Sequence, residues 1–234
     1  MRSSSYLQRR DQLTTYFDQT AAAAWRALTS NDPVSRIRAT VRAGRVDMRS
    51  TLLGWLPGDL GGLSLLDAGC GTGALAIEAA RRGADVIAVD VANNLVEVAR
   101  ERAGAEDLRG SIEFRVGDML AAAPAEVDHV VAMDSLIHYD TDDVCKVVAD
   151  FSHRARRSVL FTSAPWTPAL AAMHFVGRLV PHRHHRAPAI EPVRIGKLAR
   201  ALDERLGANG WATARTRRIK SGFYISQAME LTRR

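Results

Sequence analysis

The distribution of apolar and polar residues divides the middle of the chain into alternating segments. Short apolar runs bounded by turn residues are typical of buried strands, and apolar residues at three-to-four spacing are typical of helices. The expected strands are Ser64–Asp67, Asp85–Val89, Ser111–Val116, Val127–Met133 and Ser158–Thr162, and the expected helices cover about residues 74–82, 93–104 and 141–153. This alternation favours right-handed crossovers and a mostly parallel sheet.

A helical region precedes the alternation. Residues 6–56 read as helical, with a break at Asn31-Asp32-Pro33 and an end at Pro57-Gly58. The expected apolar positions are Tyr6, Leu13, Tyr16, Phe17, Ala24, Trp25 and Leu28 in the first helix, and Val34, Ile37, Val41, Met48, Leu52 and Leu53 in the second. Because this region is too short to hide its apolar faces alone, we expect residues 1–58 to form a helical lid on the main domain.

The pattern changes again after residue 164. Segment 165–194 is rich in proline and has no strand signal, whereas residues 195–207 return to a helical pattern. Trp211–Ile219 and Phe223–Leu231 read as two strands of a hairpin joined by Lys220-Ser221-Gly222. The sequence therefore predicts an α/β fold with a mostly parallel, seven-stranded sheet and a C-terminal antiparallel hairpin. Residues 59–164 form its core, 165–194 an inserted arm over the substrate, and 195–234 the helix and hairpin that complete the core.

Composition and charge narrow the class of protein. A chain of 234 residues is long enough for one well-buried domain with additions. It has no apolar run of the ~18 residues that a membrane span needs, and its N-terminus lacks the apolar core of a signal peptide. Cys70 and Cys145 give no disulfide framework, so a reducing cytoplasm is expected. The net charge of +6 suggests an anionic partner: nucleic acid, an acidic membrane surface or an acidic small molecule.

The glycine-rich segment Leu65–Gly73 indicates a nucleoside site. A buried strand ends in Gly69-x-Gly71-x-Gly73, where glycines let a ligand approach the backbone and the following helix offers unpaired N–H groups. Gly69-x-Gly71-x-x-Ala74 also fits the dinucleotide fingerprint, so the turn alone leaves the ligand open. Asp90 ends the second strand, 19 residues after Gly71, where a carboxylate accepts hydrogen bonds from both ribose hydroxyls. Alternatively, Asp90 or Asn93 caps the next helix.

This turn resembles the first motif of the S-adenosylmethionine-dependent methyltransferases of Rossmann-like fold. Asp67 stands two residues before the first glycine, and Gly73 adds a close approach that dinucleotide binders do not need. The resemblance implies that Asp67 lies near the cationic methionine end of the cofactor. It also implies that Asp118 of Gly117-Asp118-Met119 binds the adenine amino group, that Met119 covers the ring, and that Asp134 belongs to the cofactor site.

The segment Asp134–Tyr139 follows the fourth strand, and ligands of open α/β sheets lie beyond the carboxyl ends of strands. We therefore expect it to line the methyl-transfer site. The Asn-Pro-Pro-Tyr or Asp-Pro-Pro-Tyr motif of adenine amino methylation is missing, so nucleic acid is not the expected substrate. The chain also lacks an obvious carboxylate set for a catechol-type metal site, and His182, His184 and His185 match no standard zinc spacing. We expect no metal of the protein's own.

A closer resemblance extends over nearly the whole chain. It is carried by Tyr16-Phe17-Asp18, Trp25, Val34-Ser35-Arg36-Ile37-Arg38, Arg42-x-Gly44-Arg45, Asp67–Gly73, Asp134–Tyr139 and Phe223-Tyr224. These residues resemble the magnesium-protoporphyrin IX O-methyltransferases, most closely those of photosynthetic purple bacteria. Membership implies that S-adenosylmethionine methylates one propionate, giving the monomethyl ester of (bacterio)chlorophyll synthesis and S-adenosylhomocysteine. Magnesium then enters only as part of the substrate.

The resemblance also implies partners and a location. It implies handover of the pigment from the porphyrin-binding subunit of magnesium chelatase, and loose association with the inner or intracytoplasmic membrane. The amphipathic stripe Leu170, Met173, Val176, Leu179 and Val180 is compatible with a roof over a flat macrocycle, with membrane contact or with ordinary core packing.

The chemistry of that substrate suggests roles for a few side chains. A propionate is already ionised near neutral pH, so catalysis reduces to alignment and the exclusion of water. We expect His138 to orient the propionate and Tyr16 to close over it. Alternatively, His138 ligates the magnesium or belongs to the domain wall, and Tyr16 packs in the core. The expected substrate contacts are Trp25, Arg38, Tyr139 and Met173.

Two other functions remain open at this point. One is methylation of another small molecule, such as a quinone, a lipid or an amine. The other is a non-catalytic scaffold that binds a nucleoside, which predicts a damaged cofactor motif, whereas the motif residues of this chain are intact.

Overall fold

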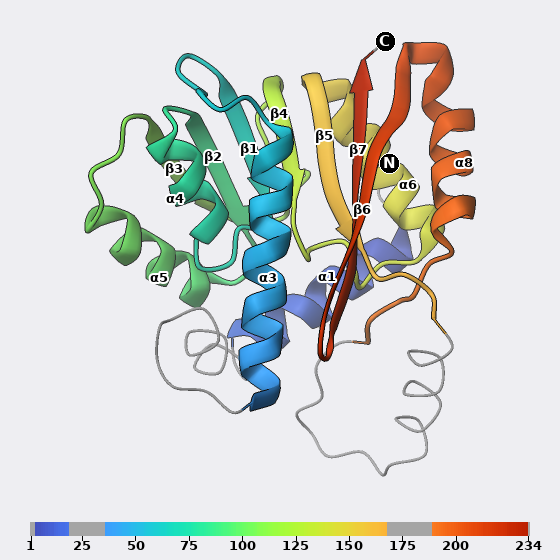
Figure 1. The fold of residues 1–234 in the computed structure, drawn as a ribbon, viewed down its shortest axis with the longest axis horizontal. Coiled ribbons are helices and arrows are strands. Elements are labelled where there is room, and N and C mark those ends of the chain that lie inside the picture. The colour runs from blue at the N-terminus through green and yellow to red at the C-terminus, as the bar shows by residue number, and fades with distance from the viewer. Residues whose placement is uncertain (1–2, 19–35, 168–188, 234) are drawn as a thin grey trace.

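The computed structural model of the protein describes residues 3–18, 36–167 and 189–233 (Figure 1). Its sheet has seven strands in the order β3-β2-β1-β4-β5-β7-β6. Their bounds are β1 Ser64–Ala68, β2 Asp85–Asp90, β3 Ser111–Val116, β4 Val127–Ala132, β5 Ala155–Ser163, β6 Trp211–Ser221 and β7 Tyr224–Arg233. Strands β1 to β5 pair in parallel, and β7 pairs antiparallel with both β5 and β6. The predicted α/β fold with a C-terminal hairpin is confirmed.

The helices also follow the sequence pattern closely. They are α1 Ser4–Tyr16, α3 Arg36–Trp55, α4 Ala74–Arg81, α5 Asn93–Gly104, α6 Thr141–Arg154 and α8 Ile195–Leu206, with a short 3-10 helix η2 at Gly207–Asn209. Most strand boundaries differ by one or two residues, and the largest difference is at β5, which begins at Ala155, directly after α6, instead of at Ser158. Ala155 is itself buried, which allows the strand to start without a connecting loop.

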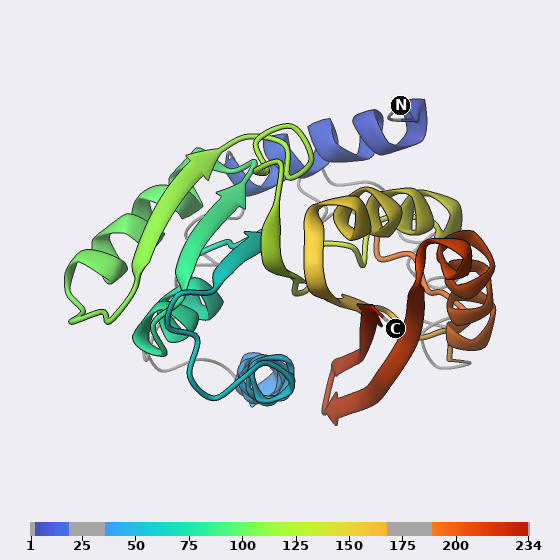
Figure 2. The same cartoon turned by 90° about the horizontal axis from the view of Figure 1, so that it is seen from above.

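Helices cover both faces of the sheet (Figure 2), and an apolar layer of buried side chains lies on each face. One layer joins buried side chains of α1, α6 and α8 to one face, for example Tyr6, Phe151 and Leu198. The other joins those of α3 and α4 to the opposite face, for example Met48 and Leu75. The central strands β1, β4 and β5 are therefore largely buried on both sides, as expected for parallel strands connected by helices.

The two N-terminal helices occupy opposite sides of the molecule. Helix α3 packs against β6, β7 and α4, and its predicted apolar residues Met48, Leu52 and Leu53 are buried. Ile37 was expected on the same face but is 55% exposed. Its end of α3 lies beside the tip of the hairpin, where a Cβ at Gly222 would come within 2.5 Å of the Thr40 hydroxyl (Figure 1). The division of the chain into a lid, a core and an arm stays a prediction.

Candidate functional site

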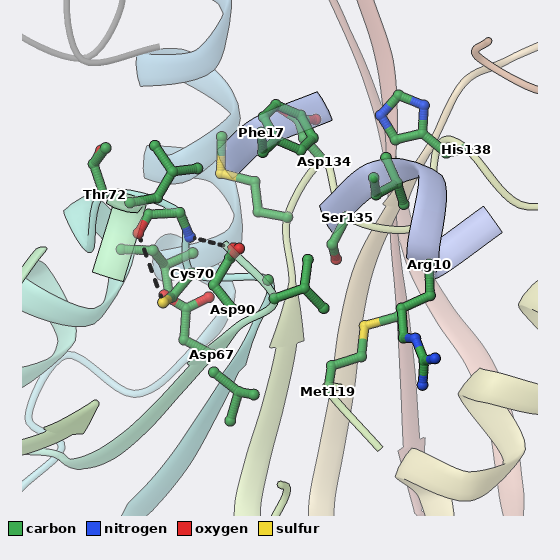
Figure 3. A pocket seen from close by; sticks show the side chains of 18 of the residues that line it. Arg10, Phe17, Asp67, Cys70, Thr72, Asp90, Met119, Asp134, Ser135 and His138 are labelled. Atoms are coloured by element: carbon green, nitrogen blue, oxygen red, sulfur yellow. Dashed lines mark hydrogen bonds between the residues drawn. The ribbon is translucent and has the colours of Figure 1, made fainter. Parts of the chain in front are cut away.

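A cleft of about 1010 Å³, counting its solvent-open part, lies at the carboxyl ends of the central strands (Figure 3). Several segments of the chain line it, among them Leu95 of α5 and Gly117 with Met119 after β3. The others are α1 with its C-cap residue, through Tyr6, Arg10, Leu13 and Phe17; α3 through Arg45 and Arg49; the glycine turn with the end of β2; and residues 133–139 after β4. Among the expected site residues, Asp67, Gly69, Gly71, Asp90, Met119, Asp134, His138 and Tyr139 line the cleft.

The glycine turn has a backbone conformation that residues with a side chain rarely adopt. Gly69, Gly71 and Gly73 have φ values of 86°, 54° and 77°, in the left-handed region. A Cβ at Gly69 would overlap Ser135 of the segment after β4, and a Cβ at Gly73 would lie 2.9 Å from the Cβ of Ala99. The turn is thus packed between α5 and the segment that carries His138, and only glycine fits it.

The carboxylate of Asp67 lies buried beneath this turn. Asp67 is 1% exposed, and its Oδ2 atom has no hydrogen-bond partner among the residues that the structure describes. Burial, with a smaller contribution from Asp90, raises the pKa of Asp67 to about 7. A buried acceptor without a donor is costly, and a cationic ligand group would supply the missing donor.

Asp90 braces the same turn. Its Oδ2 atom accepts a hydrogen bond of 2.8 Å from the backbone N–H of Gly71, and its Oδ1 atom accepts one of 2.9 Å from the N–H of Ala92. Burial raises the pKa of Asp90. The N-cap residue of α5 is Ala92, so Asp90 and Asn93 are not caps in the strict sense. Asp90 lines the cleft at the strand end where a ribose was predicted, and that role stays a prediction.

The motif Gly117-Asp118-Met119 is split between the cleft and its surroundings. Gly117 and Met119 line the cleft, whereas Asp118 is not among the lining residues. The Oδ1 atom of Asp118 accepts hydrogen bonds from the N–H groups of Leu120 and Ala121, and Arg10 of α1 lies 3.5 Å from Oδ2. Asp118 therefore closes a local turn and pairs with α1, and its contact with adenine stays a prediction.

Asp134 lines the cleft, but its carboxylate faces protein donors. Arg45 lies 2.6 Å from Oδ2, the Tyr224 hydroxyl donates at 2.9 Å to Oδ1, and the Thr162 hydroxyl lies 3.3 Å from Oδ1. The side chain of Asp134 is 4% exposed. With its oxygens engaged in this way, Asp134 is left to face a cofactor mainly through its main chain.

His138 and Tyr139 line the cleft next to α1. His138 is 9% exposed, and its Nδ1 atom lies 3.1 Å from the carbonyl oxygen of Ala189. The Tyr139 ring stacks on Tyr6 of α1, with centroids 5.0 Å apart and an interplanar angle of 20°. Burial raises the pKa of Tyr139, so its hydroxyl stays protonated at neutral pH. His138 is thus beside the cleft, as the sequence predicted.

The remaining expected residues lie elsewhere. Tyr16 is half-buried at the end of α1 and packs edge-on against Phe17, and it is Phe17 that lines the cleft. Arg38 is exposed near the start of α3 and does not line the cleft. Trp25 and Met173, together with the apolar stripe and the histidines of the arm, lie outside the described residues.

Sequence reasoning missed the arginines of α3 that reach the cleft. Arg49 is half-buried and makes no hydrogen bond or ion pair with the described part of the chain. Burial and the neighbouring Arg45 lower the pKa of Arg49. The spacing of Arg38, Arg42, Arg45 and Arg49 places four cations on one helical face, and this pattern was the available signal. An unpaired guanidinium beside a cleft is suited to a carboxylate.

The described ranges show neither a metal-binding cluster nor a membrane-spanning helix. They hold no group of three or more His, Cys, Asp or Glu side chains placed to bind a metal ion. They also hold no helix that is long and apolar enough to cross a membrane.

Fold and cleft together define an S-adenosylmethionine-dependent methyltransferase of Rossmann-like fold. Residues 65–157 match the family model described as a methyltransferase domain. The glycine cradle and the unpartnered Asp67 oxygen fit the backbone and the cationic end of such a cofactor.

The comparisons also give the family. Residues 132–233 match the model for the C-terminus of magnesium-protoporphyrin IX methyltransferase. The chain is 43% identical to magnesium-protoporphyrin O-methyltransferase of Rhodobacter capsulatus, over 97% of this chain and 98% of the relative. It is 30% identical to the corresponding Synechocystis protein over 93% of this chain and 94% of the relative. The chain belongs to the magnesium-protoporphyrin O-methyltransferase family.

Solved structures agree. The magnesium protoporphyrin IX methyltransferase of Synechocystis PCC 6803 with bound S-adenosylhomocysteine has a TM-score of 0.82 and 28% identity, covering 96% of this chain and 99% of that one. The same enzyme with bound S-adenosylmethionine has a TM-score of 0.79 and 26% identity, over 99% and 100% of the two chains. The predicted fold, class and cofactor are confirmed.

Proposed function

We propose that this protein transfers the methyl group of S-adenosylmethionine to a propionate of magnesium-protoporphyrin IX and forms the monomethyl ester. The observation that carries the proposal is that one cleft joins Asp67 and Asp90 at the glycine turn to His138 after β4. This arrangement brings a cofactor site and a group suited to a carboxylate together in a family defined by this reaction.

The chain's own residues would hold the cofactor at both ends. Asp67 is suited to the methionine ammonium because its Oδ2 atom has no hydrogen-bond partner among the described residues. Arg49 is suited to the carboxylate because its guanidinium makes no hydrogen bond or ion pair with them. Asp90 is suited to the ribose, and Met119 with Leu95 offers apolar contact for the adenine ring. When bound, S-adenosylmethionine supplies a methyl group on a positively charged sulfur, which needs no further activation.

For the transfer itself, this chain has to align the acceptor and exclude water. A propionate is ionised near neutral pH, so the site needs no strong base. His138 would orient the carboxylate from the wall of the cleft. Because Nδ1 faces the carbonyl of Ala189, the ring nitrogen suited to the propionate is Nε2. Alignment of the reacting atoms is the main source of rate enhancement available to such a site.

Helix α1 would provide the cover over the reacting atoms. It already closes one side of the cleft through Tyr6, Leu13 and Phe17. Tyr16 stands at its end and would complete the closure over the substrate. The stack of Tyr6 on Tyr139 joins this cover to the segment that carries His138. Because a covered site excludes water, the electrostatic interactions that orient the carboxylate are stronger there.

The proposal has a direct test. The protein is incubated with S-adenosylmethionine and magnesium-protoporphyrin IX, and the products are separated by chromatography. We expect the monomethyl ester and one S-adenosylhomocysteine for each ester formed. Binding of S-adenosylhomocysteine is measured in the same preparation. If the protein binds S-adenosylhomocysteine but forms no ester, the proposal is wrong.

We also propose peripheral contact with an acidic membrane through one end of the molecule. Phe223 at the hairpin tip is 66% exposed and Ile37 at the neighbouring end of α3 is 55% exposed. Exposed Arg36 and Lys220 flank them. Apolar side chains among cations suit an anionic lipid surface. Vesicles rich in anionic lipid should retain the wild-type protein and release Phe223→Ser, whereas equal retention of both would contradict the assignment.

Two expectations from the resemblance complete the proposal. The protein would work in the cytoplasm and receive its pigment from the porphyrin-binding subunit of magnesium chelatase. Both of its cysteines are free and buried, which suits a reducing compartment. A pull-down with that purified subunit, with and without the bound porphyrin, tests the handover, and no association in either state counts against it.

A further inference from the structure

Two motifs of the resemblance have no part in the proposed reaction, yet the structure brings them together. They are Gly44-Arg45 of α3 and Tyr224 at the start of β7, and both meet Asp134 at the end of β4. Arg45 lies 2.6 Å from Asp134 Oδ2, and the Tyr224 hydroxyl lies 2.9 Å from Oδ1 and 3.2 Å from Oδ2. Three segments far apart in the sequence thus converge on one carboxylate.

Asp134 has an unusual backbone. Its φ of 56° is the one positive value among the non-glycine residues that the structure describes. Such a conformation costs free energy and persists where surrounding contacts hold it. The N–H of Asp134 donates to the Thr162 hydroxyl at 2.7 Å, while the side chain is held by Arg45 and Tyr224. The cluster therefore holds Asp134 from both its main chain and its side chain.

The position of Tyr224 is set by α3. A Cβ at Gly44 would overlap the Tyr224 ring, so the helix and the ring are in direct contact. Burial and the neighbouring Asp134 raise the pKa of Tyr224, which keeps its hydroxyl a hydrogen-bond donor. In this packing the hydroxyl can reach Asp134 only while the helix leaves room for the ring.

The turn at Asp134 also determines where the next residues lie. Ser135 packs against the glycine turn, since a Cβ at Gly69 would overlap its side chain, and His138 follows three residues later. We propose that Arg45 and Tyr224 are positioning residues, which hold Asp134 in its left-handed turn and so fix His138 relative to the cofactor. The role of His138 rests on the proposed function, whereas the fixed turn does not.

The first test measures directly how firmly the turn at Asp134 is held, and it needs no porphyrin. Hydrogen exchange of peptides covering residues 133–140 is measured by mass spectrometry in the full chain bound to S-adenosylhomocysteine. Tyr224→Phe removes the hydroxyl, and Gly44→Ala displaces the ring without removing any polar group. We expect each to speed exchange of these peptides by about tenfold or more. Gly54→Ala is the matched control, because a Cβ at Gly54 would meet nothing within 4 Å.

The second test separates the backbone from the charge of Asp134. Asn and Gly tolerate a left-handed backbone, whereas Ala does not. If the turn matters, kcat should fall least in Asp134→Asn, more in Asp134→Gly and most in Asp134→Ala. If the negative charge acts on the reacting atoms instead, the three variants should be equally slow, which would overturn the proposal.

The third measurement is the split between turnover and binding in Tyr224→Phe. We expect kcat to fall about tenfold while the Kd of S-adenosylhomocysteine stays within about twofold of wild type. Unchanged exchange at residues 133–140 in both Tyr224→Phe and Gly44→Ala overturns the inference, as does a rise in Kd that matches the loss of kcat. If Tyr224→Phe fails to fold, Gly44→Ala and the Asp134 series decide the same question. If the substrate proves to be a molecule other than the porphyrin, the hydrogen-exchange and Kd results still test the inference, because neither measurement uses the porphyrin.

Discussion

The Nδ1 atom of His138 lies 3.1 Å from the carbonyl oxygen of Ala189. Because a carbonyl only accepts hydrogen bonds, Nδ1 carries the hydrogen. A ring that also donated from Nε2 to a propionate would be the doubly protonated imidazolium. A neutral ring would instead offer a lone pair from Nε2, as a metal ligand does. Orienting the propionate and ligating the magnesium, the alternative considered from the sequence, thus need different protonation states of His138.

Paired substitutions of His138 separate its two nitrogens. Asn places an amide where Nδ1 was, and Gln places one where Nε2 was. If His138 orients the propionate through Nε2, His138→Gln should retain more turnover than His138→Asn, with a loss of roughly tenfold or more in the Asn variant. Initial rates of ester formation give the comparison.

A structural role for His138 predicts the reverse order. In that case His138→Asn keeps the bond to Ala189, and its rate and melting temperature should stay near those of the wild type. His138→Gln would then be the damaged variant. The Kd of S-adenosylhomocysteine should change little in either variant.

Asp67 should make cofactor binding depend on pH. Burial and Asp90 raise its pKa to about 7 in the free protein, and an ammonium group binds only the ionised form. Affinity for S-adenosylhomocysteine should therefore weaken as pH falls below about 7, by up to about tenfold per pH unit, and level off above it. Calorimetric titrations across that range measure the profile. Asp67→Asn should bind S-adenosylhomocysteine weakly, with an affinity that does not depend on pH. If the affinities of wild type and Asp67→Asn depend on pH in the same way, the assignment is contradicted.

The same group has a consequence for stability without cofactor. The pKa of Asp67 in the folded protein is raised above its ordinary value of 3.8. Its contribution to stability is therefore present below about pH 4 and lost as pH rises through about 7. Relative to Asp67→Asn, the free wild-type protein should lose stability over that window in urea unfolding. If wild type and Asp67→Asn differ in free energy of unfolding by the same amount at pH 4 and at pH 7, the raised pKa of Asp67 is contradicted.

Arg49 and Asp90 should act on different parts of the cofactor. Arg49→Gln should raise the Kd of S-adenosylhomocysteine by about tenfold or more, because it removes the cation proposed for the carboxylate. It should leave binding of methylthioadenosine unchanged, since this nucleoside lacks the amino acid portion. Asp90→Ala should weaken both ligands. Arg36→Gln, in the same helix but away from the cleft, is the control.

If Arg49→Gln weakens both ligands equally, Arg49 supports the fold of the cleft instead of binding the carboxylate. If Asp90→Ala weakens neither, its ribose assignment falls and Asp90 is left as the brace of the glycine turn.

His129 should contribute to unfolding in acid. It is buried in β4, with Nδ1 2.7 Å from the Ser158 hydroxyl and Nε2 without a partner among the described residues. Burial lowers its pKa from 6.5, so its contribution to stability is present above about pH 6.5 and is lost as pH falls. His129→Asn does not titrate. It should reduce the acid-dependent loss of stability by up to about 1.4 kcal/mol per pH unit, measured by urea unfolding. An unchanged slope would contradict this assignment.

The sequence predicted the elements that carry the cofactor because they follow local rules. Apolar runs placed β1 and β2 within a residue of their observed bounds, and the glycine spacing located the cradle. Asp90 was predicted from its place at the end of β2, and Met119 from the resemblance of the turn after β3 to the methyltransferase family. His138 was predicted from its place in the segment after β4.

Other parts of the site depend on packing between distant segments. Arg45 and Arg49 belong to a row of arginines that, from the sequence alone, is indistinguishable from a solvated helical face. Phe17 and Tyr16 are adjacent, and only the rotation of α1 on the sheet decides which one faces the cleft. Asp118 was expected to face adenine; its hydrogen bond from Leu120 and its pairing with Arg10 depend on the local turn and on the placement of α1, and the adenine contact stays a prediction. Tyr224 reaches Asp134 only through the order of strands in the sheet.

That strand order has a consequence for biosynthesis. Strand β7 is made after the other strands, yet it is inserted between β5 and β6 and brings Tyr224 to Asp134. Chains fold from the N-terminus as they emerge from the ribosome. A nascent chain can therefore form the glycine turn and its neighbouring strands well before Tyr224 is synthesised. The growing polypeptide would acquire the means to hold its cofactor first, and the contact that holds its reactive segment only after β7 has been made.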